Sequence, residues 1–98
     1  MGRSNKYASR TVSEILGGVK PTIAQRVGKV VRDLRQEAGM SQVVFSEKCG
    51  FYQTYLSRLE NGQANPTLNA LEVIAKAFGM SIFDFFDLVK NDTREPRR

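Results

Sequence analysis

Residues 22–89 are divided by hydroxyl side chains and glycines that recur at short intervals along the chain. A serine or threonine in front of a helix can cap its free N–H groups, and a glycine behind it can take the left-handed conformation that ends it. The hydroxyl residues are Thr22, Ser41, Thr67 and Ser81, and the glycines are Gly39, Gly50, Gly62 and Gly79. Apolar residues recur at helical spacing between these marks, which predicts helices at about 23–38, 42–49, 53–61, 68–78 and 82–89.

The apolar residues of these segments predict one shared core. The first helix should bury Ile23, Val27, Val30 or Val31, Leu34 and Ala38, and the fourth should bury Leu68, Leu71, Ile74, Ala75 and Phe78. Gly28 should weaken the first helix by about 1 kcal/mol relative to alanine. No segment alternates with the period of a β-strand, and the 98 residues suffice for one small domain. The predicted fold is therefore all-α, a compact domain of five helices.

The net charge of +5 is unevenly distributed. Residues 23–88 hold seven basic and seven acidic residues, whereas residues 1–22 hold four basic residues and one acid, and residues 89–98 hold four and two. This predicts a flexible basic arm at residues 1–21, with one or two helical turns as an alternative, and a disordered basic tail at residues 90–98. Such ends often contact a polyanion, although they could equally serve solubility.

The composition argues against catalysis and against a membrane protein. There is no histidine to act as a general base, and the single cysteine, Cys49, lies on the inward face of its predicted helix. We therefore expect no enzyme activity, no cofactor and no metal site. No apolar run reaches the roughly 18 residues that would span a bilayer. The N-terminus lacks the apolar core of a secretory signal, so a cytoplasmic location is expected.

The helix predicted at 53–61 has an unusual polar face. Leu56 and Leu59 lie on one side, and Gln53, Thr54, Ser57 and Arg58 lie on the other. A surface that only meets water would more often carry pairs of Lys and Glu, whereas amide, hydroxyl and guanidinium groups match the edges of DNA bases. Together with helix 42–49 and the short turn between them, this helix has the proportions of a helix-turn-helix.

The stretch SQVVFSEKCGFYQTYLSRLENGQANPTLNALEVIAKAFGMSIFDFF resembles the phage-repressor, or xenobiotic-response-element (XRE), class of bacterial helix-turn-helix regulators. The matching features are Ser41–Gln42, Gly50 in the turn, SRLENG leading to NPT, and LEVIAKAFGMS. The resemblance covers about residues 23–88 and implies a lambda-repressor-like fold. It also implies a transcriptional regulator, a repressor or an activator, that binds double-stranded DNA with helix 53–61 as its recognition helix. The basic arm would then reach a neighbouring minor groove.

The resemblance assigns roles to individual residues. Base contacts are implied for Gln53, Thr54, Ser57 and Arg58, and phosphate contacts for Gln42, Asn61 and Gln63. Tyr52 and Tyr55 are also expected to contact phosphates, with packing beside the turn as an equal alternative for both. Arg35 and Glu60 occupy the positions of a fixed ion pair that orients the recognition helix. Two departures from the family pattern are Tyr52, where a small capping hydroxyl is usual, and the pair Val43 and Val44, where polar residues are usual.

Family members usually dimerise on a palindromic operator, and the last helix predicts a surface for this. We expect a homodimer interface at Phe83, Phe86, Leu88 and Val89, or alternatively a larger monomer core covered by the N-terminal segment. Within DNA binding, the chain could be a restriction-modification controller, a phage repressor or an antitoxin bound to its toxin. The alternative outside this class is a protein-interaction adaptor that binds DNA weakly, with Val43, Val44, Tyr52 and Tyr55 as its contact face.

Overall fold

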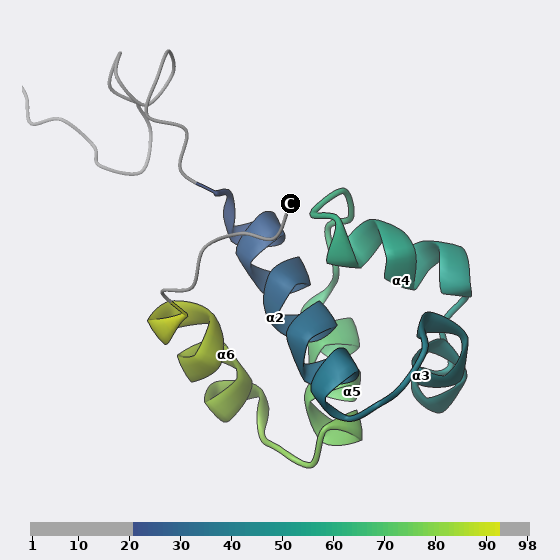
Figure 1. The fold of residues 1–98 in the computed structure, drawn as a ribbon. Helices are drawn as coiled ribbons and strands as arrows, with labels where there is room; N and C mark the ends of the chain where they lie inside the picture. The colour runs from purple at the N-terminus through teal and green to yellow at the C-terminus, as the bar shows by residue number, and fades with distance from the viewer. Residues whose placement is uncertain (1–20, 93–98) are drawn as a thin grey trace, which may run out of the picture.

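The computed structural model of the protein describes residues 21–92, which form five helices and no strand (Figure 1). The helices are α2 (Ile23–Glu37), α3 (Gln42–Cys49), α4 (Gln53–Glu60), α5 (Leu68–Ala77) and α6 (Ile82–Asn91). The prediction of an all-α fold with five helices is confirmed, and all but one of the predicted bounds agree to within one residue. All but residue 21 of the predicted arm, and residues 93–98 of the predicted tail, lie outside the described residues. The prediction of a disordered tail from residue 90 is wrong for Lys90 and Asn91, which are the last two residues of α6.

The predicted N-terminal caps are present on four helices. The hydroxyl groups of Thr22, Ser41, Thr67 and Ser81 each accept a hydrogen bond from the backbone N–H three residues later, at 3.0–3.1 Å. At α2 the cap is reciprocal, because the Gln25 side chain accepts a bond from the backbone N–H of Thr22. Helix α4 is the exception, since its N-cap residue, Tyr52, makes no capping bond with its side chain.

Helix α2 lies at the centre of the domain and packs against both α4 and α6 (Figure 1). Helix α3 packs on α4 and α5, and α5 packs on α6. The buried apolar side chains form one cluster, consisting of Val27, Val30, Val31, Phe45, Leu56, Leu59, Leu71, Ile74, Ala75, Phe85 and Val89. The rings of Phe45 and Phe78 stack with their centroids 4.5 Å apart, which joins α3 to the end of α5. This core fixes α3 and α4 relative to each other.

Three residues predicted for the core are exposed instead. Ile23 and Leu68 are 65% and 69% exposed, and Ala38 is also exposed. Ile23 and Leu68 are the first residues of α2 and α5, and Ala38 follows the last residue of α2. Helical spacing marks the side of a helix that faces the core, but it does not reveal that the ends of these helices extend past it.

The prediction that Val89 belongs to an exposed interface is wrong, because this side chain is 2% exposed and lies in the core. Val89 lies four residues after buried Phe85 and therefore on the same side of α6, which continues to Asn91, two residues beyond the predicted end. Arg26 of α2 donates hydrogen bonds to the carbonyl oxygens of Val89 and Lys90 at 2.8 and 3.1 Å. These bonds hold the last turn of α6 against α2.

Candidate nucleic-acid interface

Helices α3 and α4 are joined by a turn with a defined geometry. Gly50 has φ 74° and ψ 28°, a left-handed conformation that ends α3. The backbone N–H of Phe51 then donates to the carbonyl oxygen of Ser46 at 2.8 Å. The ring of Phe51 meets the ring of Tyr55 edge-on, with the centroids 5.2 Å apart. The turn therefore holds the start of α4 next to the end of α3, as a helix-turn-helix requires.

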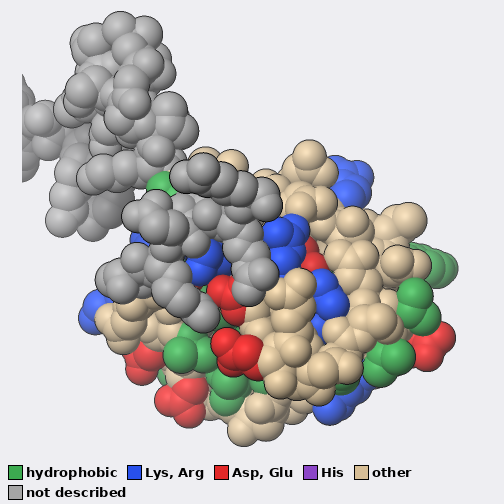
Figure 2. Space-filling view, viewed as in Figure 1, with side chains coloured by type: hydrophobic (Ala, Val, Ile, Leu, Met, Phe, Trp, Pro, Cys, Tyr) green, Lys and Arg blue, Asp and Glu red, His purple; other side chains and the backbone are tan. Residues whose placement is uncertain are grey.

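Helix α4 has one apolar face and one exposed polar face. Leu56 and Leu59 are at most 2% exposed and anchor the helix in the core. The four residues predicted to contact bases are on its other side, where Gln53, Thr54 and Arg58 are exposed and Ser57 is half-buried. In the view of Figure 2, the surface over α4 is mostly uncharged, whereas basic and acidic side chains lie side by side over α2 and α6. The polar face of α4 thus presents mixed hydrogen-bonding groups with a single charge.

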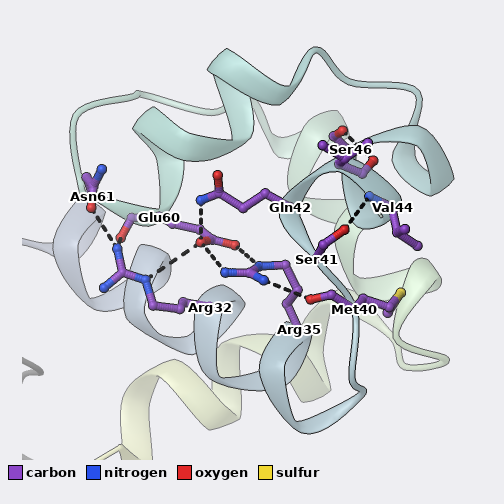
Figure 3. Close-up of polar contacts among 10 residues, drawn as sticks. Arg32, Arg35, Met40, Ser41, Gln42, Val44, Ser46, Glu60 and Asn61 are labelled. Atoms are coloured by element: carbon purple, nitrogen blue, oxygen red, sulfur yellow. Dashed lines mark hydrogen bonds and ion pairs between the residues drawn. The ribbon is translucent and has the colours of Figure 1, made fainter.

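The C-terminal end of α4 is fixed by a buried carboxylate (Figure 3). Glu60, whose side chain is fully buried, accepts hydrogen bonds from Arg35 Nε at 2.6 Å and from Arg35 Nη2 at 3.0 Å. Arg35 Nη1 also donates to the carbonyl oxygen of Met40 at 2.8 Å, and Gln42 Nε2 donates to Glu60 Oε1 at 3.0 Å. One carboxylate therefore ties the end of α4 to α2 and to the first residue of α3.

Arg32 takes part in the same network, although it is not among the residues predicted from the sequence. Its Nη2 atom donates to Asn61 Oδ1 at 2.6 Å and to the Glu60 carbonyl oxygen at 3.4 Å. Its Nε atom lies 3.6 Å from Glu60 Oε1. Arg32 precedes Arg35 by three residues and so shares its side of α2. That spacing is the signal that could have identified it.

Gly28 is a contact residue rather than only a weak point of α2. A Cβ atom here would collide with the carbonyl oxygens of Leu59 and Glu60, 2.7 Å from the latter. A Cβ on Gly62 would likewise lie 2.9 Å from the Cα atom of Gln25. Gln25, Gly28, Arg32 and Arg35 are three or four residues apart and form what we call the α4-contact face of α2. The absence of a side chain at Gly28 lets α2 approach α4 closely, and the absence of one at Gly62 lets the turn after α4 approach the start of α2.

The residues predicted to contact phosphates lie around the two ends of α4. Tyr52 is 84% exposed at its start, and Tyr55 is half-buried beside Phe51. Asn61 and Gln63 are exposed just after its end, and Arg58 donates to the Gln63 carbonyl oxygen at 3.1 Å. Gln42 is half-buried, and its amide is engaged with Glu60. The structure therefore brings Gln42 and Asn61 together around the Glu60 network, whereas Tyr52 lies at the opposite end of the helix.

Cys49 is half-buried and packs against the core. Burial raises the pKa of its thiol to about 11, although neighbouring Lys48 acts in the opposite direction. The Cys49 thiol is therefore protonated at neutral pH and is a poor nucleophile. Burial also raises the pKa of the Tyr55 hydroxyl. Within residues 21–92, no three His, Cys, Asp or Glu side chains are grouped as metal ligands.

Both α6 and α3 carry exposed apolar side chains. On α6, Phe83 is 76% exposed and Phe86, one turn further along, is half-buried. Leu88 is 41% exposed, but five residues on from Phe83 it is rotated by about 140° around the helix axis. The structure therefore brings Phe83 and Phe86 together and places Leu88 on another side. On α3, Val43 and Val44 are 45% and 51% exposed.

None of the helices between residues 21 and 92 combines the length and apolar character needed to cross a membrane.

Residues 31–85 match the family model described as helix-turn-helix. The chain is 44% identical over 55 residues to the uncharacterised HTH-type transcriptional regulator y4dJ of Sinorhizobium fredii, covering 56% of this chain and 71% of that one. It is 34% identical over 56 residues to the immunity repressor of Bacillus phage phi105, covering 57% of this chain. The chain spans only 39% of that repressor.

The fold is also similar to solved structures of restriction-modification controller proteins. The wild-type controller C.Esp1396I superposes with a TM-score of 0.65 and 30% sequence identity, over 72% of this chain and 93% of that one. The same controller has been solved as a tetramer in complex with its natural 35-base-pair operator. The controller C.AhdI from Aeromonas hydrophila gives a TM-score of 0.61 at 27% identity, over 64% of this chain and 96% of that one.

Proposed function

Because the chain belongs to the helix-turn-helix family of transcriptional regulators, we propose that it recognises a specific double-stranded DNA sequence with α4 and binds a palindromic operator as a dimer. The observation that carries this proposal is the polar face of α4. This face presents Gln53, Thr54, Ser57 and Arg58 on the side opposite to the leucines that anchor the helix. A helix of this kind fits the major groove, where each base pair displays a distinct pattern of donors and acceptors.

Two of these side chains can form paired hydrogen bonds with a base. The exposed amide of Gln53 is suited to the N6 and N7 atoms of adenine, and the guanidinium of Arg58 is suited to the O6 and N7 atoms of guanine. Arg58 uses one of its five N–H groups on the Gln63 carbonyl oxygen, so the others remain for a base. The hydroxyl groups of Thr54 and Ser57 complete the face. Gln53 and Arg58 should therefore provide most of the base preference.

Phosphate contacts would hold this face in the groove. We assign them to Gln42, Tyr52, Tyr55, Asn61 and Gln63, which surround the two ends of α4. At its start, the backbone N–H groups of α4 receive no bond from the Tyr52 side chain, and such groups favour an anion. Contacts at both ends of α4 would fix the orientation of the helix without reading sequence themselves.

A dimer is proposed because one recognition helix covers too few base pairs to select an operator. Phe83 is the most exposed apolar side chain of α6, and with Phe86 it offers a surface that a second copy would bury. A related controller, C.Esp1396I, assembles as a tetramer on its operator. Sedimentation equilibrium should show a dimer at micromolar concentration, and Phe83→Asp should convert it to a monomer. A wild-type protein that stays monomeric would contradict the dimer.

Selection from a randomised duplex pool with the full-length protein at physiological salt tests the proposal directly. We expect a palindromic consensus with half-sites about one helical turn, roughly 10 base pairs, apart. Arg58→Ala should weaken binding by about 1–3 kcal/mol and relax the preference at one base pair of each half-site. An equal loss on every sequence would instead make Arg58 a phosphate contact.

A pool without any consensus would contradict sequence-specific recognition. The alternative would then be a protein-interaction adaptor, including an antitoxin that binds a toxin. The specific observation in its favour is the exposure of Val43, Val44 and Tyr52. Under that alternative, replacing these residues would abolish partner binding, whereas Arg58→Ala would have no effect on it.

A further inference from the structure

The side-chain amide of Asn61 is held in one orientation. Its Oδ1 atom accepts a hydrogen bond from Arg32 Nη2 at 2.6 Å (Figure 3). A guanidinium group has only donors, so the amide atom that faces it must be the oxygen. The NH2 group of Asn61 is therefore directed away from Arg32. Asn61 is exposed, and its amide presents donors to the surroundings of the domain.

Arg32 is itself restrained by the end of α4. The same Nη2 atom is 3.4 Å from the Glu60 carbonyl oxygen, and the Nε atom is 3.6 Å from the Glu60 carboxylate. That carboxylate is fully buried and is bound by Arg35 and Gln42. The guanidinium group of Arg32 thus contacts Asn61 through Nη2 and Glu60 through both Nη2 and Nε. These contacts with Glu60 restrain the group that holds the Asn61 amide.

The charges at this position favour an anion. Asn61 is the C-cap of α4, and the C-terminal end of a helix carries a partial negative charge that repels a phosphate. Glu60 contributes one negative charge, whereas Arg32 and Arg35 contribute two positive charges within 4 Å of its carboxylate. The surplus positive charge offsets the helix dipole where Asn61 offers its donors.

From these observations we infer that Arg32 is a positioning residue for DNA binding, which orients the Asn61 amide so that its NH2 group donates to a backbone phosphate. This inference rests on the proposed DNA-binding function and deepens it. Arg32 would act through Asn61 and would not read bases. Its loss should therefore weaken binding to all sequences by the same factor.

A double-mutant cycle in DNA affinity tests this inference. The variants are Arg32→Lys, which keeps the charge but lacks the planar group that reaches two acceptors, Asn61→Ala, and the two combined. Each single change should weaken binding to the selected operator and to a scrambled duplex about three- to tenfold, the effect of one hydrogen bond. The combined variant should be no weaker than either single one, because both remove the same contact.

The matched control uses Arg26, which lies on the same helix and donates to carbonyl oxygens at the end of α6. Arg26→Lys removes a similar bond without touching Asn61. In the variant that combines it with Asn61→Ala, the loss of DNA affinity should therefore equal the product of the two single fold-losses. Urea unfolding of each variant ensures that folded proteins are compared. If the losses from Arg32→Lys and Asn61→Ala also multiply, the inference is wrong. If the wild-type protein does not prefer the operator to the scrambled duplex, the proposed function fails instead.

Discussion

The two ends of α4 are held in opposite ways. At the C-terminal end, buried Glu60 is bound by Arg35 and Gln42, and no Cβ atom at Gly28 separates the backbones of α2 and α4. At the N-terminal end, Tyr52 is 84% exposed and provides no capping bond. The protein thus fixes this helix with polar bonds at the end joined to α2, and leaves the first N–H groups of the other end without a side-chain cap.

This difference indicates how a small domain can hold an exposed polar helix such as α4 in a fixed orientation. A buried ion pair is weak evidence for stability in general, because desolvation opposes the attraction between the charges. Its value here is geometric, since Arg35 reaches α4 through two hydrogen bonds and the loop after α2 through a third. Because its C-terminal end and the buried side chains of Leu56 and Leu59 hold α4 in place, this helix does not need a cap at its N-terminal end.

The largest expected effect on stability comes from disrupting the Glu60 network at the C-terminal end of α4. Glu60→Ala leaves Arg35, which is only 8% exposed, without its buried partner, and this should lower the free energy of unfolding by about 3–5 kcal/mol. Urea unfolding at pH 7 measures the loss. Glu72→Ala, which removes an exposed acid from α5, is the matched control and should change stability by less than about 0.5 kcal/mol.

A second variant keeps this prediction testable if Glu60→Ala does not fold. Replacing both partners, with Arg35→Met and Glu60→Leu, removes the two buried charges together. The double variant should be more stable than Glu60→Ala because no unpaired charge remains. If Glu60→Ala loses less than about 1 kcal/mol, the network does not fix the end of α4 in the way the structure indicates.

A smaller effect is expected from Gly28→Ala, which pushes α2 and α4 apart. The new Cβ atom would meet backbone carbonyl groups that cannot move alone, so we expect a loss of about 1–3 kcal/mol despite the better helix propensity of alanine. Thermal or urea unfolding measures this loss. Because the end of α4 must shift, affinity for the selected operator should fall as well.

Gly39→Ala is the matched control for this prediction. Gly39 has open space around its Cβ position but a φ of +73°, so alanine should destabilise the protein by about 1–2 kcal/mol through the backbone alone. It should leave the DNA affinity of the folded protein unchanged, since nothing lies within 4 Å of its Cβ position and α4 need not shift. Equal effects of the two substitutions on affinity would show that close approach at Gly28 does not set the position of α4.

These contacts also mark the limit of what the sequence could predict. The caps at Thr22, Ser41, Thr67 and Ser81 act within a single helical turn, so residue type and spacing were sufficient to find them. The apolar and polar faces of α4 could likewise be predicted from the helical spacing of its residues. The pairing of Arg35 with Glu60 came from the family resemblance, because nothing local joins residues 25 positions apart.

The remaining features depend on how helices cross. Gly28 looked like a defect because its neighbour, the backbone of α4, is distant in sequence. Arg32 lacked a visible partner for the same reason. Val89 was assigned to an exposed surface although it follows Phe85 by four residues, a spacing that puts both side chains on one face of α6. The contacts of Gly28 and Arg32 with α4 are defined only by the tertiary structure, whereas the position of Val89 could have been predicted from this spacing.

The smallest expected effect concerns the uncapped N-terminal end of α4. Tyr52 already has the extended backbone of an N-cap, with φ −72° and ψ 145°, as Ser41 does with φ −74° and ψ 167°. Tyr52→Ser should therefore add the missing capping bond and raise the free energy of unfolding by about 1 kcal/mol, measured by urea unfolding. Little packing is lost, because the ring is 84% exposed.

The control Tyr52→Ala removes the same ring but adds no hydroxyl, so it should give no gain in stability. Measuring operator affinity for both variants then separates two explanations of the uncapped start. If both bind DNA more weakly while only Tyr52→Ser is more stable, the tyrosine is kept for a phosphate contact at the expense of the cap. If affinity is unchanged in both, the proposed contact of Tyr52 is wrong. The fold would then tolerate the uncapped N-terminal end of α4 because the C-terminal end holds the helix in place.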